Sequence, residues 1–131
     1  MSMGARSDQE VLRVGPLEVV PDEHLVWIAG RALNLSTREL RLLTELVRRA
    51  HRITPREALF GLVWGREMRA GDRSVDVYVH KLRVKLEEAL PGWQFIHTHF
   101  GFGYRLSPEP SRMPRTTGAA STDLNAEFTS G

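Results

Sequence analysis

The chain has 131 residues, a formal net charge of +2, 41% hydrophobic residues and no cysteine. This length suits one compact domain of about 100 residues with an appendage, and the lack of cysteine excludes disulfides and thiolate metal sites. No apolar run reaches the roughly 18 residues of a membrane helix, and no secretory signal is visible at the N-terminus, so we expect a cytoplasmic globular protein without a membrane span.

The first third of the chain predicts a small antiparallel sheet. We expect residues 1–9 to be disordered. Short β-type runs, separated by turns rich in glycine and proline, then cover residues 11–14, 17–20, 24–29 and 32–35. Leu25 and Trp27 alternate as residues of one buried face would, and Leu33 and Leu35 are candidates for the same face.

Two helices are predicted next, each after a capping box. Ser36-Thr37-Arg38-Glu39 has the capping-box pattern, and helical spacing of apolar residues continues to about Arg49. Thr54-Pro55-Arg56-Glu57 repeats the pattern, with Pro55 at the first helical position. That helix ends near Trp64-Gly65. Its predicted inner face consists of Ala58, Leu59, Leu62 and Val63, and that of the preceding helix of Leu40, Leu43, Leu46 and Val47.

A third helix is predicted over residues 73–88, with Asp72 as its cap. At about 100° per residue, one stripe carries Val75, Val79, Leu82 and Leu86. The opposite face carries Arg73, Val77, His80, Lys81 and Val84, with Ser74, Tyr78 and Lys85 at its shoulder. A DNA major groove would suit this mixed face, because cations meet base edges there and apolar groups meet thymine methyls. An ordinary surface helix is the alternative.

A β-hairpin follows, with strands over residues 94–98 and 104–106 joined by a glycine-containing turn. A hairpin directly after a helix-turn-helix predicts a winged helix. We expect an ordered domain over residues 10–107 and a disordered tail over 108–131, where large apolar residues are few. His97 and His99 alternate, but no third ligand has suitable spacing, so we expect no metal and no other cofactor.

Four segments resemble, in combination, the OmpR/PhoB-type winged-helix output domain of bacterial response regulators. They are LSTREL (35–40), VWG (63–65), RSVDVYVHKLRVKL (73–86) and GFGYRL (101–106). The resemblance implies an α+β fold with a four-stranded N-terminal antiparallel sheet, three helices and a C-terminal hairpin wing. It also implies sequence-specific binding of double-stranded DNA and transcriptional control in a two-component system, without enzymatic activity.

The resemblance places DNA contacts on the third helix and the wing. Base contacts fall on Val77, Tyr78, His80 and Lys81. Backbone contacts fall on Trp64, Arg73, Ser74, Arg83 and Thr98, to which we add Lys85. Structural alternatives are a core position for Trp64 and intrahelical pairing of Arg73 and Arg83 with Asp76 or Glu87. Asp76 itself is expected to be structural. Lys81 is the first choice for a base contact.

The wing departs from the family pattern at His99 and Phe100. Similar proteins usually carry an Arg there, which would enter the minor groove, and Phe100 cannot make that electrostatic contact. Phe100 could instead pack against a sugar or an apolar neighbour.

The resemblance also implies protein partners. The loop residues Arg66, Glu67, Met68 and Arg69 correspond to a segment that the family presents to RNA polymerase, through its sigma or alpha subunit. A second copy on tandem DNA sites, transcription activation and association with the nucleoid follow in the same way. The alternative function is a protein-interaction module that acts on RNA polymerase with little DNA affinity, which Phe100 and the low net charge would favour.

Overall fold

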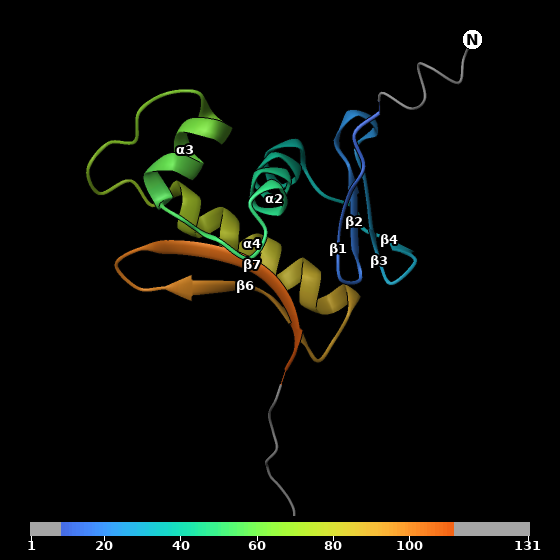
Figure 1. Ribbon diagram of the computed structural model, residues 1–131. Helices are drawn as coiled ribbons and strands as arrows, with labels where there is room; N and C mark the ends of the chain where they lie inside the picture. Colours follow the sequence, from blue (N-terminus) through green and yellow to red (C-terminus); the bar gives the residue numbers. More distant parts are fainter. Residues whose placement is uncertain (1–8, 112–131) are drawn as a thin grey trace, which may run out of the picture.

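The computed structural model describes residues 9–111, in which two antiparallel sheets flank three helices (Figure 1). The first sheet has the strand order β1-β2-β3-β4, and the second has the order β5-β7-β6. The strands of the first sheet are β1 (Leu12–Val14), β2 (Leu17–Val20), β3 (Leu25–Ile28) and β4 (Arg31–Ala32), with a 3-10 turn, η1 (Pro21–Glu23), between β2 and β3. The predicted four-stranded N-terminal sheet is confirmed.

The buried face of β3 is the opposite of the predicted one. Val26 and Ile28 are buried, whereas Leu25 and Trp27 are more than a third exposed. The reason lies in the register with β2, because Val26 pairs with Val19 and Ile28 with Leu17, and both partners are in the core. Alternation along one strand gives two faces, and the neighbouring strand decides which of them is buried. Leu33 and Leu35 are partly buried against the core, as predicted.

The helices are α2 (Thr37–Arg48), α3 (Arg56–Trp64) and α4 (Ser74–Ala89). At α2 the capping box is present: Glu39 N donates to Ser36 Oγ at 3.2 Å, and Ser36 N donates to Glu39 Oε1 at 2.9 Å. The second predicted capping box is wrong. Thr54 belongs to strand β5, and Pro55 precedes α3 without a side-chain cap. Thr54 pairs with Tyr104 in a ladder, and this pairing fixes it as a strand residue.

The buried faces of α2 and α3 form one core with both sheets and α4. In α2 the four predicted residues are buried, together with Leu42, which the pattern missed. In α3 the buried residues are Leu59, Phe60 and Val63, whereas Ala58 and Leu62 are exposed. A nine-residue helix has too few turns for its periodicity to define a face, and packing against α2 and α4 decides it.

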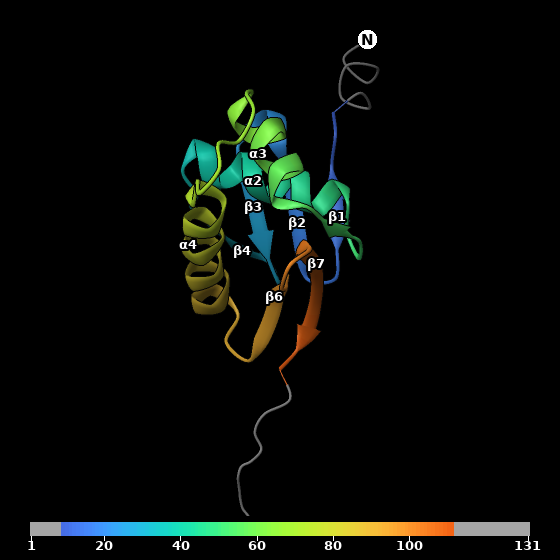
Figure 2. The ribbon, with the colours of Figure 1, turned by 90° about the vertical axis from the view of Figure 1, so that its left-hand side faces the viewer.

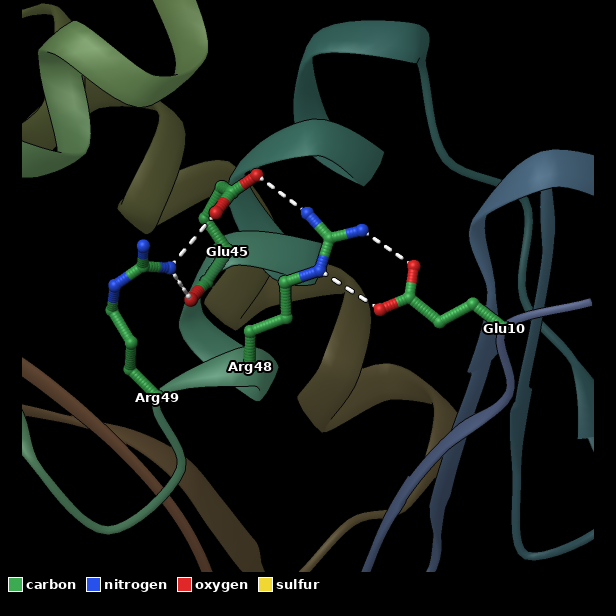
Figure 3. Close-up of polar contacts among 4 residues, drawn as sticks. All are labelled: Glu10, Glu45, Arg48 and Arg49. Carbon is green, nitrogen blue, oxygen red and sulfur yellow. Dashed lines mark hydrogen bonds and ion pairs between the residues drawn. The ribbon is translucent and has the colours of Figure 1, made fainter.

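An ion-pair network joins the start of the described chain to the end of α2 (Figure 3). Arg48 donates from Nε to Glu10 Oε2 at 3.0 Å and from Nη2 to Glu10 Oε1 at 2.5 Å. Glu45 accepts from Arg48 Nη1 at 2.9 Å and from Arg49 Nη1 at 2.8 Å. The hydrogen bond from Arg48 is the largest influence on the Glu10 carboxyl and lowers its pKa. The network fixes the segment before β1 against α2.

The second sheet consists of β5 (Ile53–Thr54), β6 (Trp93–His99) and β7 (Gly103–Pro110). The strand β5 was not predicted; it lies between the two predicted helices α2 and α3. The strand β7 continues three residues beyond the predicted end of the domain at 107. The predicted disordered regions, 1–9 and 108–131, otherwise lie almost entirely outside the described residues. β6 and β7 form the predicted hairpin, which packs against α4.

Candidate nucleic-acid interface

The helix α4 has the predicted apolar stripe, and its opposite face is open to solvent. Val75, Val79, Leu82 and Leu86 are at most 1% exposed. Arg73, Val77, His80, Lys81 and Val84 are exposed. The prediction that Asp72 caps this helix is wrong, because α4 begins at Ser74 with Arg73 at the N-cap position and no side-chain cap; Asp72 Oδ1 instead accepts from Ser74 N at 2.8 Å. The face that the sequence assigned to DNA is therefore accessible in the described part of the chain.

Aromatic rings support the first half of this exposed face. Trp64 is half-buried and stacks on Phe60, with ring centroids 4.8 Å apart, and meets Tyr78 edge-on at 5.6 Å. The Lys81 ammonium lies 4.7 Å from the Tyr78 ring centroid, and the Arg38 guanidinium lies 4.7 Å from that of Trp64. These cation–π contacts hold two positive charges beside α4 while leaving their polar groups near solvent.

Asp76 is a structural hub, as predicted. Its carboxylate accepts from Arg56 at 3.0 and 3.1 Å and from the Tyr104 hydroxyl at 2.5 Å, so it joins α3, α4 and β7. Arg73 Nε lies 3.3 Å away, which is the intrahelical pairing proposed as its structural alternative. Burial and the hydrogen bond to Asp76 raise the pKa of Tyr104 to about 12. The Tyr104 hydroxyl is therefore a neutral donor at physiological pH.

Arg83 is bound within the protein. Its guanidinium donates to the Ile96 carbonyl at 2.9 and 3.1 Å and to Thr98 Oγ1 at 2.5 Å. The ring of Tyr104 lies beneath it, at 5.8 Å. The proposed alternative, pairing with Glu87, is not the contact formed. Arg83 instead fixes β6 against α4, so it positions the wing relative to the exposed helix face.

Lys85 also has a partner inside the protein. Its ammonium lies 2.7 Å from Glu39 Oε1, and Glu39 is almost fully buried. Lys85 thus joins the middle of α4 to the capping box of α2. The sequence predicts a DNA-backbone contact for Lys85 because it lies at the shoulder of the exposed face on a helical wheel. A helical wheel does not show that α2 packs beside that shoulder.

A groove of about 520 Å³ lies between α4, the start of α3 and the wing. Its charged lining consists of three arginines, Arg56, Arg73 and Arg83, and two carboxylates, Glu57 and Asp76, and Thr98 and Tyr104 contribute hydroxyl groups. Its outer wall is the hairpin turn of the wing, residues 99–103. Arg56, which sequence patterns had placed only in a capping motif, therefore belongs to the site. Arg56 precedes Asp76 by 20 residues in the sequence, and the tertiary contact between α3 and α4 brings the two side chains together at the groove.

The loop between α3 and α4 differs from expectation at one residue. Arg66, Glu67 and Arg69 are exposed, but Met68 is half-buried and packs against the core. The Arg66 guanidinium lies 4.8 Å from the Phe60 ring centroid. The thioether of Met68 therefore anchors the loop, and its charged residues remain at the surface.

Within residues 9–111, no group of three or more metal-ligating side chains lies together. His97 instead contacts the Ser107 carbonyl at 2.8 Å, and His99 Nε2 accepts from Arg105 Nε at 3.0 Å. None of the helices in the same range is long and apolar enough to cross a membrane.

Comparison with known proteins identifies the family. Residues 30–106 match the family model described as "Transcriptional regulatory protein, C terminal", which is more than half of the chain. The chain belongs to this family. It is an OmpR/PhoB-type domain, as the four sequence segments implied, and the family consists of DNA-binding transcription-regulator domains rather than enzymes.

Curated OmpR/PhoB-type relatives are longer proteins. The alkaline phosphatase synthesis regulator SphR of Synechococcus elongatus is 35% identical over 96 residues, which cover 73% of this chain and 37% of SphR. The DNA-binding response regulator MtrA of Mycolicibacterium smegmatis is 33% identical over 99 residues, covering 76% of this chain and 43% of MtrA. The chain therefore spans less than half the length of these relatives.

Solved structures of isolated domains match over nearly their full length. The RstA DNA-binding domain of Klebsiella pneumoniae, in complex with the RstA box, has a TM-score of 0.68 and 32% identity, covering 75% of this chain and 97% of that domain. The CpxR DNA-binding domain of E. coli has a TM-score of 0.68 and 28% identity, covering 75% and 96%. The winged-helix fold of this chain agrees with these domains.

Proposed function

We propose that this domain regulates transcription by placing α4 in the major groove of a specific DNA site, with the wing at the adjacent minor groove. The observation that carries the proposal is the exposed face of α4 beside an arginine-lined groove. In this arrangement Lys81 and His80 meet base edges, while Val77 and Tyr78 offer apolar surface to thymine methyls. The RstA DNA-binding domain, which has the same fold, was solved in complex with the RstA box, and this supports DNA binding by the present domain.

The phosphate contacts come from residues at the edges of this face. Arg73 is 78% exposed at the start of α4, and its contact with Asp76 is compatible with a second contact to phosphate. We assign further phosphate contacts to Ser74, Thr98 and Trp64, of which Thr98 lines the groove. Arg83 and Lys85 act mainly inside the protein, because their charges are already paired with acceptor groups. We therefore assign the strongest phosphate contribution to Arg73.

The test is selection of bound sites from random duplex DNA, followed by mobility shift with variants. We expect Lys81→Ala to lose about 1–3 kcal/mol of binding free energy and to relax specificity. We expect Arg73→Ala to weaken all duplexes alike and to reduce the salt slope by about one. Arg13→Ala is the matched control, since Arg13 is an exposed arginine on the N-terminal sheet. Equal binding of Lys81→Ala and wild type across all sites would refute the assignment of α4.

Protein partners extend the same proposal. The exposed Arg66, Glu67 and Arg69 of the α3–α4 loop form a surface for RNA polymerase, through its sigma or alpha subunit. Two copies on tandem sites would give one domain per repeat, and footprinting of selected sites measures this copy number. Such an activator would act in the cytoplasm, at the nucleoid. If the wild-type protein binds duplex DNA only weakly and without salt dependence, a protein-interaction module is the better description.

A further inference from the structure

The tip of the β6–β7 hairpin carries two exposed aromatic rings. Phe100 is 88% exposed and Phe102 is 72% exposed, and the next large hydrophobic residue among residues 9–111, Val77, is only 48% exposed. A phenylalanine ring in water forgoes the stabilisation that burial would give it. Clustered apolar groups at an exposed tip mark a surface that is covered when a partner binds.

The turn places Phe100 at its apex. Phe102 N donates to the His99 carbonyl at 2.8 Å, which closes a four-residue turn. Gly101, the third residue of this turn, has a φ of 83°, while Phe100 before it does not have a positive φ. This combination is that of a type II turn, in which the second residue lies at the corner. Phe100 therefore lies at the outermost point of the wing.

The base of the wing is held firmly. A Cβ at Gly103 would lie 2.1 Å from the Thr54 carbonyl oxygen, so β7 is in close contact with β5 there. Arg83 holds β6 through Ile96 and Thr98, and Arg105 donates to His99 at 3.0 Å. These contacts fix the apex in one position relative to α4. Unstacking a base step costs free energy. A side chain that is already held in position inserts without a further entropic cost of ordering the hairpin.

The apex also continues the surface assigned to DNA. Phe100 and Phe102 line the same groove as Arg56 and Arg73. The hairpin turn projects on the side of the molecule where the α3–α4 loop lies (Figure 1), and the view onto that side shows α4 to the left of the hairpin (Figure 2). If phosphates occupy the arginine-lined groove, the wing tip lies just beyond them, where a duplex presents its minor groove.

We propose that Phe100 enters the minor groove as an apolar wedge that partly unstacks one base-pair step and kinks the DNA. This inference rests on the proposed DNA-binding function and extends it to a specificity determinant. An uncharged ring gains little from the negative potential of a narrow minor groove, whereas phenylalanine wedges open base steps and bend the duplex toward the major groove. The preferred step is then a flexible pyrimidine–purine step, TA or CA, at a position that no polar side chain contacts.

The test uses duplexes recovered by selection from random DNA, with 2-aminopurine replacing each adenine in turn. On binding of the wild-type protein we expect fluorescence to rise at one step on the wing side, and end-to-end energy transfer to report a bend. Phe100→Ala should abolish both signals and weaken binding about tenfold. Phe100→Arg should bind without the fluorescence rise, because a cation occupies the groove without unstacking. Leu25→Ala, at an exposed leucine on the N-terminal sheet, is the matched control and should behave like wild type.

The outcomes distinguish a failure of DNA binding from a failure of the wedge alone. Failure of the wild-type protein to enrich any duplex would overturn the DNA-binding function and the wedge together. Enrichment with a normal salt slope, but with no fluorescence rise at any position or with an equal rise in Phe100→Ala, would overturn the wedge alone. Circular dichroism of each variant checks that the hairpin and core are intact.

Discussion

The Lys85 ammonium lies 2.7 Å from a carboxylate oxygen of Glu39, a residue that is only 4% exposed. Glu39 also closes the capping box of α2 through Ser36. The pair therefore joins the two helices at a buried acceptor, whereas Lys81, one turn earlier on α4, is exposed and its ammonium lies over the Tyr78 ring. Lys85 therefore has a structural role, whereas Lys81 remains available to a ligand.

Substitution of these lysines should separate stability from binding. Lys85→Gln should lower the free energy of unfolding by about 1 kcal/mol, because it leaves a buried carboxylate without its charged partner, although Lys85 is partly solvated. Lys81→Gln should leave stability unchanged and weaken binding to selected DNA. Urea denaturation and mobility shift on the same samples measure both quantities. The opposite pattern, with Lys81→Gln the less stable variant, would contradict these roles.

The Glu39 carboxyl should make stability depend on pH in the acid range. Burial raises its pKa, but hydrogen bonds from Lys85 and Ser36 more than offset this, so the pKa lies below its ordinary value of 4.5. A carboxyl with a lowered folded-state pKa stabilises the fold above its unfolded-state pKa, and this contribution is lost as pH falls through the folded value.

We therefore expect the melting temperature to decrease as pH falls below about 4.5, and to decrease less steeply in Glu39→Gln. Part of the slope will remain, because hydrogen bonds also lower the pKa of the Glu10 and Asp72 carboxyls. Thermal unfolding monitored by circular dichroism across the acid range measures the difference. Identical slopes in both proteins would show that Glu39 is not responsible.

Two glycines of the wing should respond differently to alanine. Gly103 has a φ of 150°, and a Cβ there would lie 2.1 Å from the Thr54 carbonyl oxygen, so Gly103→Ala should cost more than about 2 kcal/mol of stability. Gly101 has a φ of 83° but open space around it, so Gly101→Ala should cost about 1 kcal/mol through backbone strain alone. Chemical denaturation of the two variants compares their free energies of unfolding directly. Similar losses would show that β5 shifts to make room for the Cβ at position 103.

The Tyr104 hydroxyl should titrate late and matter for stability. Its folded-state pKa of about 12 exceeds the ordinary value of 10.0, so it stabilises the fold below about pH 10 and this contribution is lost as pH rises toward 12. Ultraviolet absorbance titration of the folded protein should show a late phenolate step that disappears in Tyr104→Phe. That variant should also lose about 1 kcal/mol, because Asp76 loses a buried donor. Persistence of the late step would assign it to another tyrosine.

The sequence by itself determined the three helices, the N-terminal sheet, the wing hairpin and the stripe of α4 that is buried. Periodicity and capping are local properties of the chain, and Val75, Val79, Leu82 and Leu86 satisfy a pattern that one helix can bury against any core. The four segments 35–40, 63–65, 73–86 and 101–106 were enough, in combination, to indicate the family.

Only the tertiary structure decided which face of β3 is buried, that Thr54 forms a strand, and that Arg83 and Lys85 are held within the protein. Each of these depends on a partner on another element: Val19 for Val26, Tyr104 for Thr54, Ile96 for Arg83 and Glu39 for Lys85. A helical wheel gives the direction of a side chain but not what lies in that direction. Packing therefore decides which charged side chains are available to a ligand. Arg56 belongs to the groove because α3, α4 and β7 come together at Asp76, which binds both Arg56 and Tyr104.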